Sequence, residues 1–217
     1  MHDPFHALIA DAREFLNDLE ANNSRDWFQG EKDRYDQKLK QPALRLLDQL
    51  SATFARMPDV PSVPKLFRPH RDVRFSKDQT PYHTHLHMLW SSGRVPGRGP
   101  CLFFGVSPTY VRFGGGIMAF EKTGLDDWRQ AIDGNFGSEL SALLVQLERL
   151  GFLPEEPELK RVPAPYQKDH AHADLLRRKG LTVWRDLPRS DWITPLSALT
   201  NMQKSLQPLL KRLQDHL

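Results

Sequence analysis

Apolar residues recur at helical spacing in three segments at the start of the chain. They span residues 5–19, 24–39 and 42–54, and the polar stretch EANNS separates the first two. The third segment has Pro42 in its first turn, a position that suits the fixed φ of proline. Residues 1–57 are therefore predicted to be helical.

The pattern changes between residues 65 and 118 to short apolar runs separated by turn-forming residues. Four strands are predicted, at Leu66–Arg74, Tyr82–Trp90, Cys101–Val106 and Tyr110–Ile117. The links between them, which include SSGRVPGRGP and SPT, are too short for parallel crossovers and favour an antiparallel meander. The glycine triplet at 114–116 is interpreted as a place where the strand bends or approaches another backbone.

Residues 119–217 are predicted to form helices and one strand. Helical spacing covers 123–135, 138–151 and 172–180, a strand follows at 181–188, and a closing helix runs from 191 to 217. Together the three regions predict an α+β fold with a central antiparallel sheet flanked by N-terminal and C-terminal helices, in a single domain over 1–217.

Composition narrows the class of protein. The chain has 39% hydrophobic and 26% charged residues, which is ordinary for a globular protein, and has no apolar run long enough to cross a membrane. The N-terminus lacks the pattern of a signal peptide. The single cysteine, Cys101, excludes an internal disulfide and a zinc site built mainly from cysteine. We therefore expect a cytoplasmic protein with no membrane partner.

The net charge of +3 is unevenly distributed. Residues 60–115 carry 8 Lys/Arg against 2 Asp/Glu, whereas residues 1–59 have a net charge of −3 and residues 116–217 are neutral. A local excess of this kind favours an anionic partner. The alternative is that the central arginines pair with carboxylates of the flanking helices.

Four of these eight basic residues and both acidic ones lie in FRPHRDVRFSKDQTPYHTHLHMLW, residues 67–90. Strand alternation would place Arg68, Asp72 and Arg74 on one face, where Asp72 could pair with either arginine. Arg71 would lie on the other, mostly apolar face and would need a carboxylate, for which Asp78 is close in sequence. The following SKDQTPY reads as an ordered turn whose exposed amides, beside Lys77, would make a modest anion site.

The second half of this stretch places His83, His85 and His87 on one face of a strand. Two of them could bind a metal ion if a neighbouring element supplied a third ligand, such as Asp72 or His70. The alternative is a polar row without a metal, and no cofactor is expected.

Other chemistries find little support. Cys101 begins an apolar run and is interpreted as a core thiol, and Ser76 and Ser107 lack a glycine-flanked nucleophile turn. In the later segment, His170 and His172 near a helix start could meet the central arginines or could be exposed.

The chain resembles the family of bacterial and fungal proteins catalogued as domain of unknown function 2461. The resemblance covers FLNDLEANNSRDWFQGEKDRYDQ and is strongest at FRPHRDVRFSKDQTPYHTH, then continues through GGGI, WRQAI and LKRVPAPYQKDHAHADLLRRKG. The family implies no established activity. It usually has a residue other than histidine at position 83, so the resemblance implies that the histidine row is specific to this member.

Three hypotheses follow. In the first, the protein is a binding protein or an enzyme for an anionic small ligand that bears phosphate or carboxylate. Its candidate ligand-binding residues are Arg68, Arg71, Arg74, Ser76, Lys77 and Tyr82, and its candidate proton carriers are Asp72, Asp78 and His170. In the second, a basic face binds nucleic acid or protein, with Tyr82 and Trp90 as stacking surfaces. In the third, the motif is a charged buttress between helices and sheet.

Overall fold

The computed structural model describes residues 3–57, 60–91 and 99–216. Its N-terminal helices are α1 (Leu8–Ala21), α2 (Arg25–Gly30), α3 (Lys32–Arg34), a π-helical turn (Tyr35–Lys40) and α4 (Gln41–Phe54). Each of the three predicted helical segments is confirmed, although the second is divided into short pieces. Ser24 caps α2 by accepting a hydrogen bond from the amide of Trp27.

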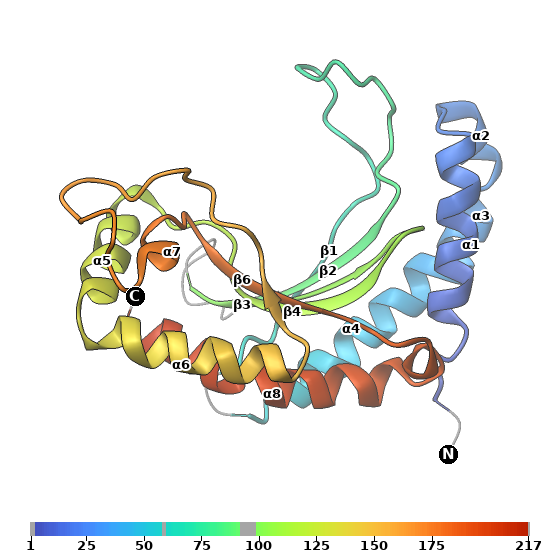
Figure 1. Ribbon diagram of the computed structural model, residues 1–217. Helices are drawn as coiled ribbons and strands as arrows, with labels where there is room; N and C mark the ends of the chain where they lie inside the picture. The colour runs from blue at the N-terminus through green and yellow to red at the C-terminus, as the bar shows by residue number, and fades with distance from the viewer. Residues whose placement is uncertain (1–2, 58–59, 92–98, 217) are drawn as a thin grey trace.

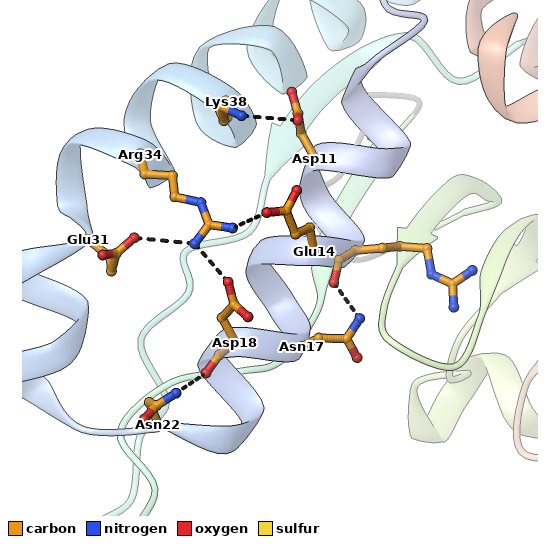
Figure 2. A network of polar contacts seen from close by, with 9 residues as sticks. Asp11, Glu14, Asn17, Asp18, Asn22, Glu31, Arg34 and Lys38 are labelled. Atoms are coloured by element: carbon orange, nitrogen blue, oxygen red, sulfur yellow. Dashed lines mark hydrogen bonds and ion pairs between the residues drawn. The ribbon is translucent and has the colours of Figure 1, made fainter.

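Acidic residues of α1 form ion pairs with basic side chains of the helices that follow (Figure 2). Arg34 donates to Asp18 at 2.8 Å and to Glu31 at 3.3 Å through Nη1, and to Glu14 at 3.1 Å through Nη2. These carboxylates are therefore engaged within the N-terminal helices, and they do not neutralise the central arginines.

In the described residues, six strands form one sheet in the order β1-β2-β3-β4-β6-β5, and every neighbouring pair is antiparallel. The strands are β1 (Val63–Leu66), β2 (Leu86–Ser91), β3 (Cys101–Val106), β4 (Val111–Ile117), β5 (Leu153–Pro154) and β6 (Leu181–Asp186). The predicted α+β class, with a central antiparallel sheet, is confirmed. Most of the predicted loop SSGRVPGRGP, at 92–98, lies outside the described residues.

The first two predicted strands are largely wrong in extent. β1 ends at Leu66 and β2 begins only at Leu86, so residues 67–85 form a long loop, hereafter the signature loop. Its two sides meet in one isolated bridge, His70 with Tyr82. At its base the amide of Phe67 still donates to the His87 carbonyl of β2, and at its tip the amide of Ser76 donates to the Val73 carbonyl in a turn. The predicted sorting of its arginines onto two strand faces therefore does not hold.

The C-terminal half contains the predicted helices and strand in their predicted order, but β5 was not predicted and the helix expected at 172–180 is only four residues long. The helices are α5 (Lys122–Asp133), α6 (Asn135–Arg149), α7 (Ala173–Leu176) and α8 (Pro195–His216), and a 3-10 turn covers Arg189–Ile193. The closing helix begins at Pro195 instead of residue 191, because the preceding residues form that turn. No helix in the described part of the chain is long and apolar enough to cross a membrane.

The sheet packs one face against α4, α6 and α8, which lie beneath it in Figure 1. Trp90, Phe104 and Phe113 are fully buried on this side, and the indole N–H of Trp90 reaches α4. The opposite face is bordered by α1 and α2 at one end and by α5 at the other (Figure 1). We call it the open face; it carries His85, His87, Leu89, Phe103, Arg112 and Trp184, all half-buried except Phe103.

Candidate functional site

The signature loop is attached to the α1–α2 connection through Tyr82. The side-chain amide of Asn23 donates to the Tyr82 carbonyl at 2.9 Å, and its oxygen accepts from the Tyr82 amide at 3.1 Å. The Tyr82 ring stacks on Phe28 with centroids 4.1 Å apart and is only 6% exposed. Tyr82 therefore anchors the loop, and its buried ring presents no free stacking surface.

The side chain of Arg71 joins the two sides of the signature loop. Its Nη1 donates to Asp78 Oδ2 at 2.5 Å, to the Thr80 carbonyl at 3.2 Å and to the Thr80 hydroxyl. The predicted partner of Arg71, Asp78, is confirmed. Bonds from the Thr80 amide and from Arg71 lower the pKa of Asp78 to about 2. Asp78 is thus a permanent carboxylate at neutral pH, suited to orienting Arg71 and poorly suited to carrying a proton.

Arg74 and Asp72 form a second, exposed pair. Their side chains bond at 2.6 and 2.9 Å and are 77% and 50% exposed, and the pKa of Asp72 is lowered by these bonds. The predicted pairing of Asp72 is therefore confirmed with Arg74. The predicted amide cradle is not formed at Ser76, since its N–H donates to Val73 within the loop.

A depression of about 440 Å³ lies between the signature loop and the end of α1. It is lined by Glu20, Asn23, Arg71, Asp78, Thr80, His83, Thr84 and His85. We call it the Arg71 depression. Of the residues predicted to bind or act on a ligand, it brings together Arg71 and Asp78. The lining does not include Arg68, Asp72, Arg74, Ser76, Lys77 or Tyr82.

The three histidines share one side of the chain, as predicted, and stack on one another. Ring centroids are 4.7 Å apart for His83 and His85 and 3.7 Å for His85 and His87, with interplanar angles of 29° and 15°. In the described ranges no group of three or more His, Cys, Asp or Glu is placed to hold a metal ion.

All three histidines have pKa values below the ordinary value. Burial is the largest cause of the lowered pKa at each histidine. The charges of Arg71 and Arg68 lower the pKa of His83 further, and neighbouring histidines lower those of His85 and His87 further. The pKa falls to about 4 at His85 and to about 3 at His87, where Arg112 also contributes. His85 and His87 are therefore neutral at pH 7, and the field of two signature-loop arginines reaches His83.

The histidine row continues into aromatic residues that the sequence analysis did not select. His87 Nε2 lies 2.7 Å from the Tyr110 hydroxyl. The guanidinium of Arg112 lies 4.6 Å from the Tyr110 ring centroid and 4.4 Å from that of Trp184. The alternation of Tyr110, Arg112 and Gly114 in sequence was a usable signal for one side of a strand. Their proximity to Trp184 depends on the pairing of β4 with β6.

His170 is placed apart from the signature loop. The segment that contains it lies near α5, at the opposite end of the sheet from that loop in Figure 1. Its Nε2 lies 3.1 Å from Asp133, and its Nδ1 accepts from the amide of His172. Of the two alternatives for these histidines, contact with the central arginines is therefore wrong, and both side chains are half-buried instead of exposed.

Cys101 is half-buried at the start of β3, and burial raises the pKa of its thiol, which disfavours the nucleophilic thiolate.

The chain thus folds as an α+β protein. Its signature loop is bonded to the connection between α1 and α2 and lies beside the Arg71 depression. Residues 11–213 match the family described as Conserved hypothetical protein (DUF2461), and the chain belongs to this family. Comparison with curated proteins and with solved structures gave no match.

Proposed function

We propose that the protein binds a small anionic ligand, bearing phosphate or carboxylate, in the Arg71 depression. The observation that carries the proposal is the bonding of Arg71. Among the residues that the structure describes, all hydrogen bonds from its side chain leave through Nη1. Nε and Nη2 are left to donate to a ligand, and paired guanidinium donors suit phosphate and carboxylate oxygens.

The charges around the depression support this assignment. Within the described ranges, the ion pairs of the signature loop are internal, Arg71 with Asp78 and Arg74 with Asp72. Arg68 and Lys77 have no ion pair among the described residues, so the positive excess of the central stretch is only partly neutralised. The lining itself carries Arg71 against Glu20 and Asp78, so attraction of an anion depends on the free donors of Arg71 and on the positive charge of the neighbouring loop.

The other lining residues suggest which anions fit. His85, neutral at pH 7, can donate or accept a hydrogen bond without adding a charge. Glu20 also lines the depression and would repel a second anionic group, but it can accept from a hydroxyl. We therefore favour a hydroxylated monoester phosphate or a hydroxy acid.

If a reaction takes place there, its proton carrier is best sought at His83. The earlier candidates are less well placed: Asp78 is held as a carboxylate by Arg71, Asp72 is bound to Arg74 at an exposed position, and His170 lies apart.

The test is titration calorimetry with inorganic phosphate, glycerol phosphate and lactate at constant ionic strength. Arg71→Lys keeps the charge but removes the fork, so we expect affinity to fall about tenfold or more, or about 1.4 kcal/mol. Arg74→Ala is the matched control, since its pair lies outside the depression, and it should change affinity less than about twofold. Absence of binding by all three anions, or equal losses in the two variants, would count against the proposal.

Two alternatives remain for the signature loop. Nucleic-acid binding is less well supported, because neither proposed stacking residue is accessible: Trp90 is fully buried and Tyr82 is 6% exposed. A structural role gains support from the three bonds of Arg71 within the loop. If that role is the whole function, Arg71→Lys will lower the thermal stability, and wild-type protein will bind no anion.

A further inference from the structure

A second depression, of about 450 Å³, lies at the edge of the sheet, where β5 pairs with β6. It is lined by Arg112, Gly151, Leu153, Glu155, Trp184, Arg185 and Asp186. We propose that this depression binds a small zwitterion with an apolar side chain, of the class of the free α-amino acids. The proposal is independent of the Arg71 depression.

Arg112 would bind the carboxylate. Its guanidinium is stacked against Tyr110 and Trp184, at 4.6 and 4.4 Å from the ring centroids. Stacking occupies the faces of the guanidinium, whereas its N–H groups point outward in the plane and stay available. In the part of the chain that the structure describes, Arg112 has no ion pair or side-chain hydrogen bond. A half-buried arginine in this state matches a bidentate carboxylate.

Two glycines leave the space that the aromatic rings beside Arg112 occupy. A Cβ at Gly114 would lie 2.6 Å from the Trp184 ring, and one at Gly105 would lie 3.1 Å from the Tyr110 ring. Both rings therefore lie close over the backbone of the sheet, and the Tyr110 hydroxyl is fixed by His87. Restricting the rings restricts Arg112, which reduces the entropy lost when a ligand binds.

The opposite charge of a zwitterion is met by carboxylates on the same rim. Asp186 is the cross-strand partner of Arg112, is exposed, and has no ion pair in the described ranges; Glu155 also lines the depression. Arg112 and Arg185 balance these two acidic residues, so a simple anion gains no net attraction. A ligand carrying an ammonium beside its carboxylate can satisfy both signs at once.

Apolar surface completes the match. Leu153 is 54% exposed, and Trp184 is half-buried beside Phe103, with ring centroids 5.5 Å apart. An open depression of this size accommodates a single amino acid with an aliphatic or aromatic side chain. Together, the unpaired guanidinium, the unpaired carboxylate and the apolar wall favour a zwitterion over an anion.

The experiment compares three probes that share one ring and chain length, by NMR titration of the indole N–H of Trp184. L-Phenylalanine carries both charges, 3-phenylpropionate carries only the carboxylate, and phenethylamine carries only the ammonium. We expect L-phenylalanine to bind about tenfold or more tightly than either analogue. Equal affinities for the three probes, or no L-phenylalanine binding below about 10 mM, would overturn the proposal.

Variants separate the two charges. Arg112→Gln should reduce the affinity for L-phenylalanine to that of phenethylamine, and Asp186→Asn should reduce it to that of 3-phenylpropionate. Arg112→Lys retains the charge in case the glutamine variant does not fold, and should still lose about fivefold through loss of the fork. Arg74→Ala is the control, because Arg74 is exposed outside both depressions and its loss should leave all three affinities unchanged. Loss of binding in that control, or an unaltered probe preference in Arg112→Lys and Asp186→Asn, would contradict the assignment.

Discussion

Acid should destabilise the protein through the histidine stack. The pKa values of His85 and His87 are about 4 and about 3 in the fold, whereas an unfolded histidine titrates near 6.5. Below pH 6.5 the unfolded chain therefore binds protons that the folded chain does not bind. Stability contributed by these histidines is complete above pH 6.5 and decreases as the pH falls toward 4 and 3.

The lowered pKa values of His85 and His87 determine how much stability is lost in acid. Proton linkage gives an upper bound of about 2 kcal/mol for each histidine between pH 8 and pH 5. Both rings are partly exposed, so solvent screening reduces this figure, and we expect roughly 2 kcal/mol from the two together. The effect is large enough to separate from other titrating groups when variants are compared.

The assay is urea unfolding at pH 8, 6.5 and 5 at constant ionic strength. The double variant His85→Gln, His87→Gln removes both titrating rings, so its free energy of unfolding should fall about 2 kcal/mol less between pH 8 and 5 than that of wild type. His6→Gln, at an exposed position, is the control and should follow wild type. If the double variant shows the wild-type pH dependence, the histidines are not held neutral by the fold and the reasoning fails.

Two further substitutions test how the sheet and the signature loop are held. Gly114→Ala should lower the free energy of unfolding by about 2 kcal/mol or more, because the added Cβ would meet the Val183 carbonyl and the Trp184 ring. Thermal melts measure the change. Gly124→Ala is the control and should be neutral or stabilising, because the space around Gly124 is open. Asn23→Ala removes both bonds to the Tyr82 backbone and should destabilise by about 1–3 kcal/mol. Hydrogen exchange at the Tyr82 amide should then accelerate, and an unchanged rate would show that the loop does not depend on this attachment.

The sequence predicted well those elements whose burial follows a simple period. The bounds of β3 match the prediction, because its residues form a continuous apolar run. The glycine triplet was interpreted correctly as a close approach: a Cβ at Gly116 would meet the Leu181 carbonyl, and Gly116 has φ of +135°.

The signature loop was predicted less well, for a physical reason. Alternation of charged and apolar residues resembles a strand, but the pairing of Arg71 with Asp78 joins residues seven positions apart and replaces strand pairing with a closed loop. The cluster of Arg112 with Trp184 was missed because it depends on the register between two distant strands. Contacts of that kind have no local pattern in the sequence.

The central claim is that an anion binds beside Arg71, and the pKa of His83 reports it most directly. Burial and the charges of Arg71 and Arg68 lower that pKa in the free protein. A bound phosphate would offset the two cations and favour the imidazolium. NMR titration of the His83 side chain in inorganic phosphate, compared with chloride at equal ionic strength, should show a pKa higher by about half a unit or more. A pKa of His83 that is the same in both salts would contradict the account.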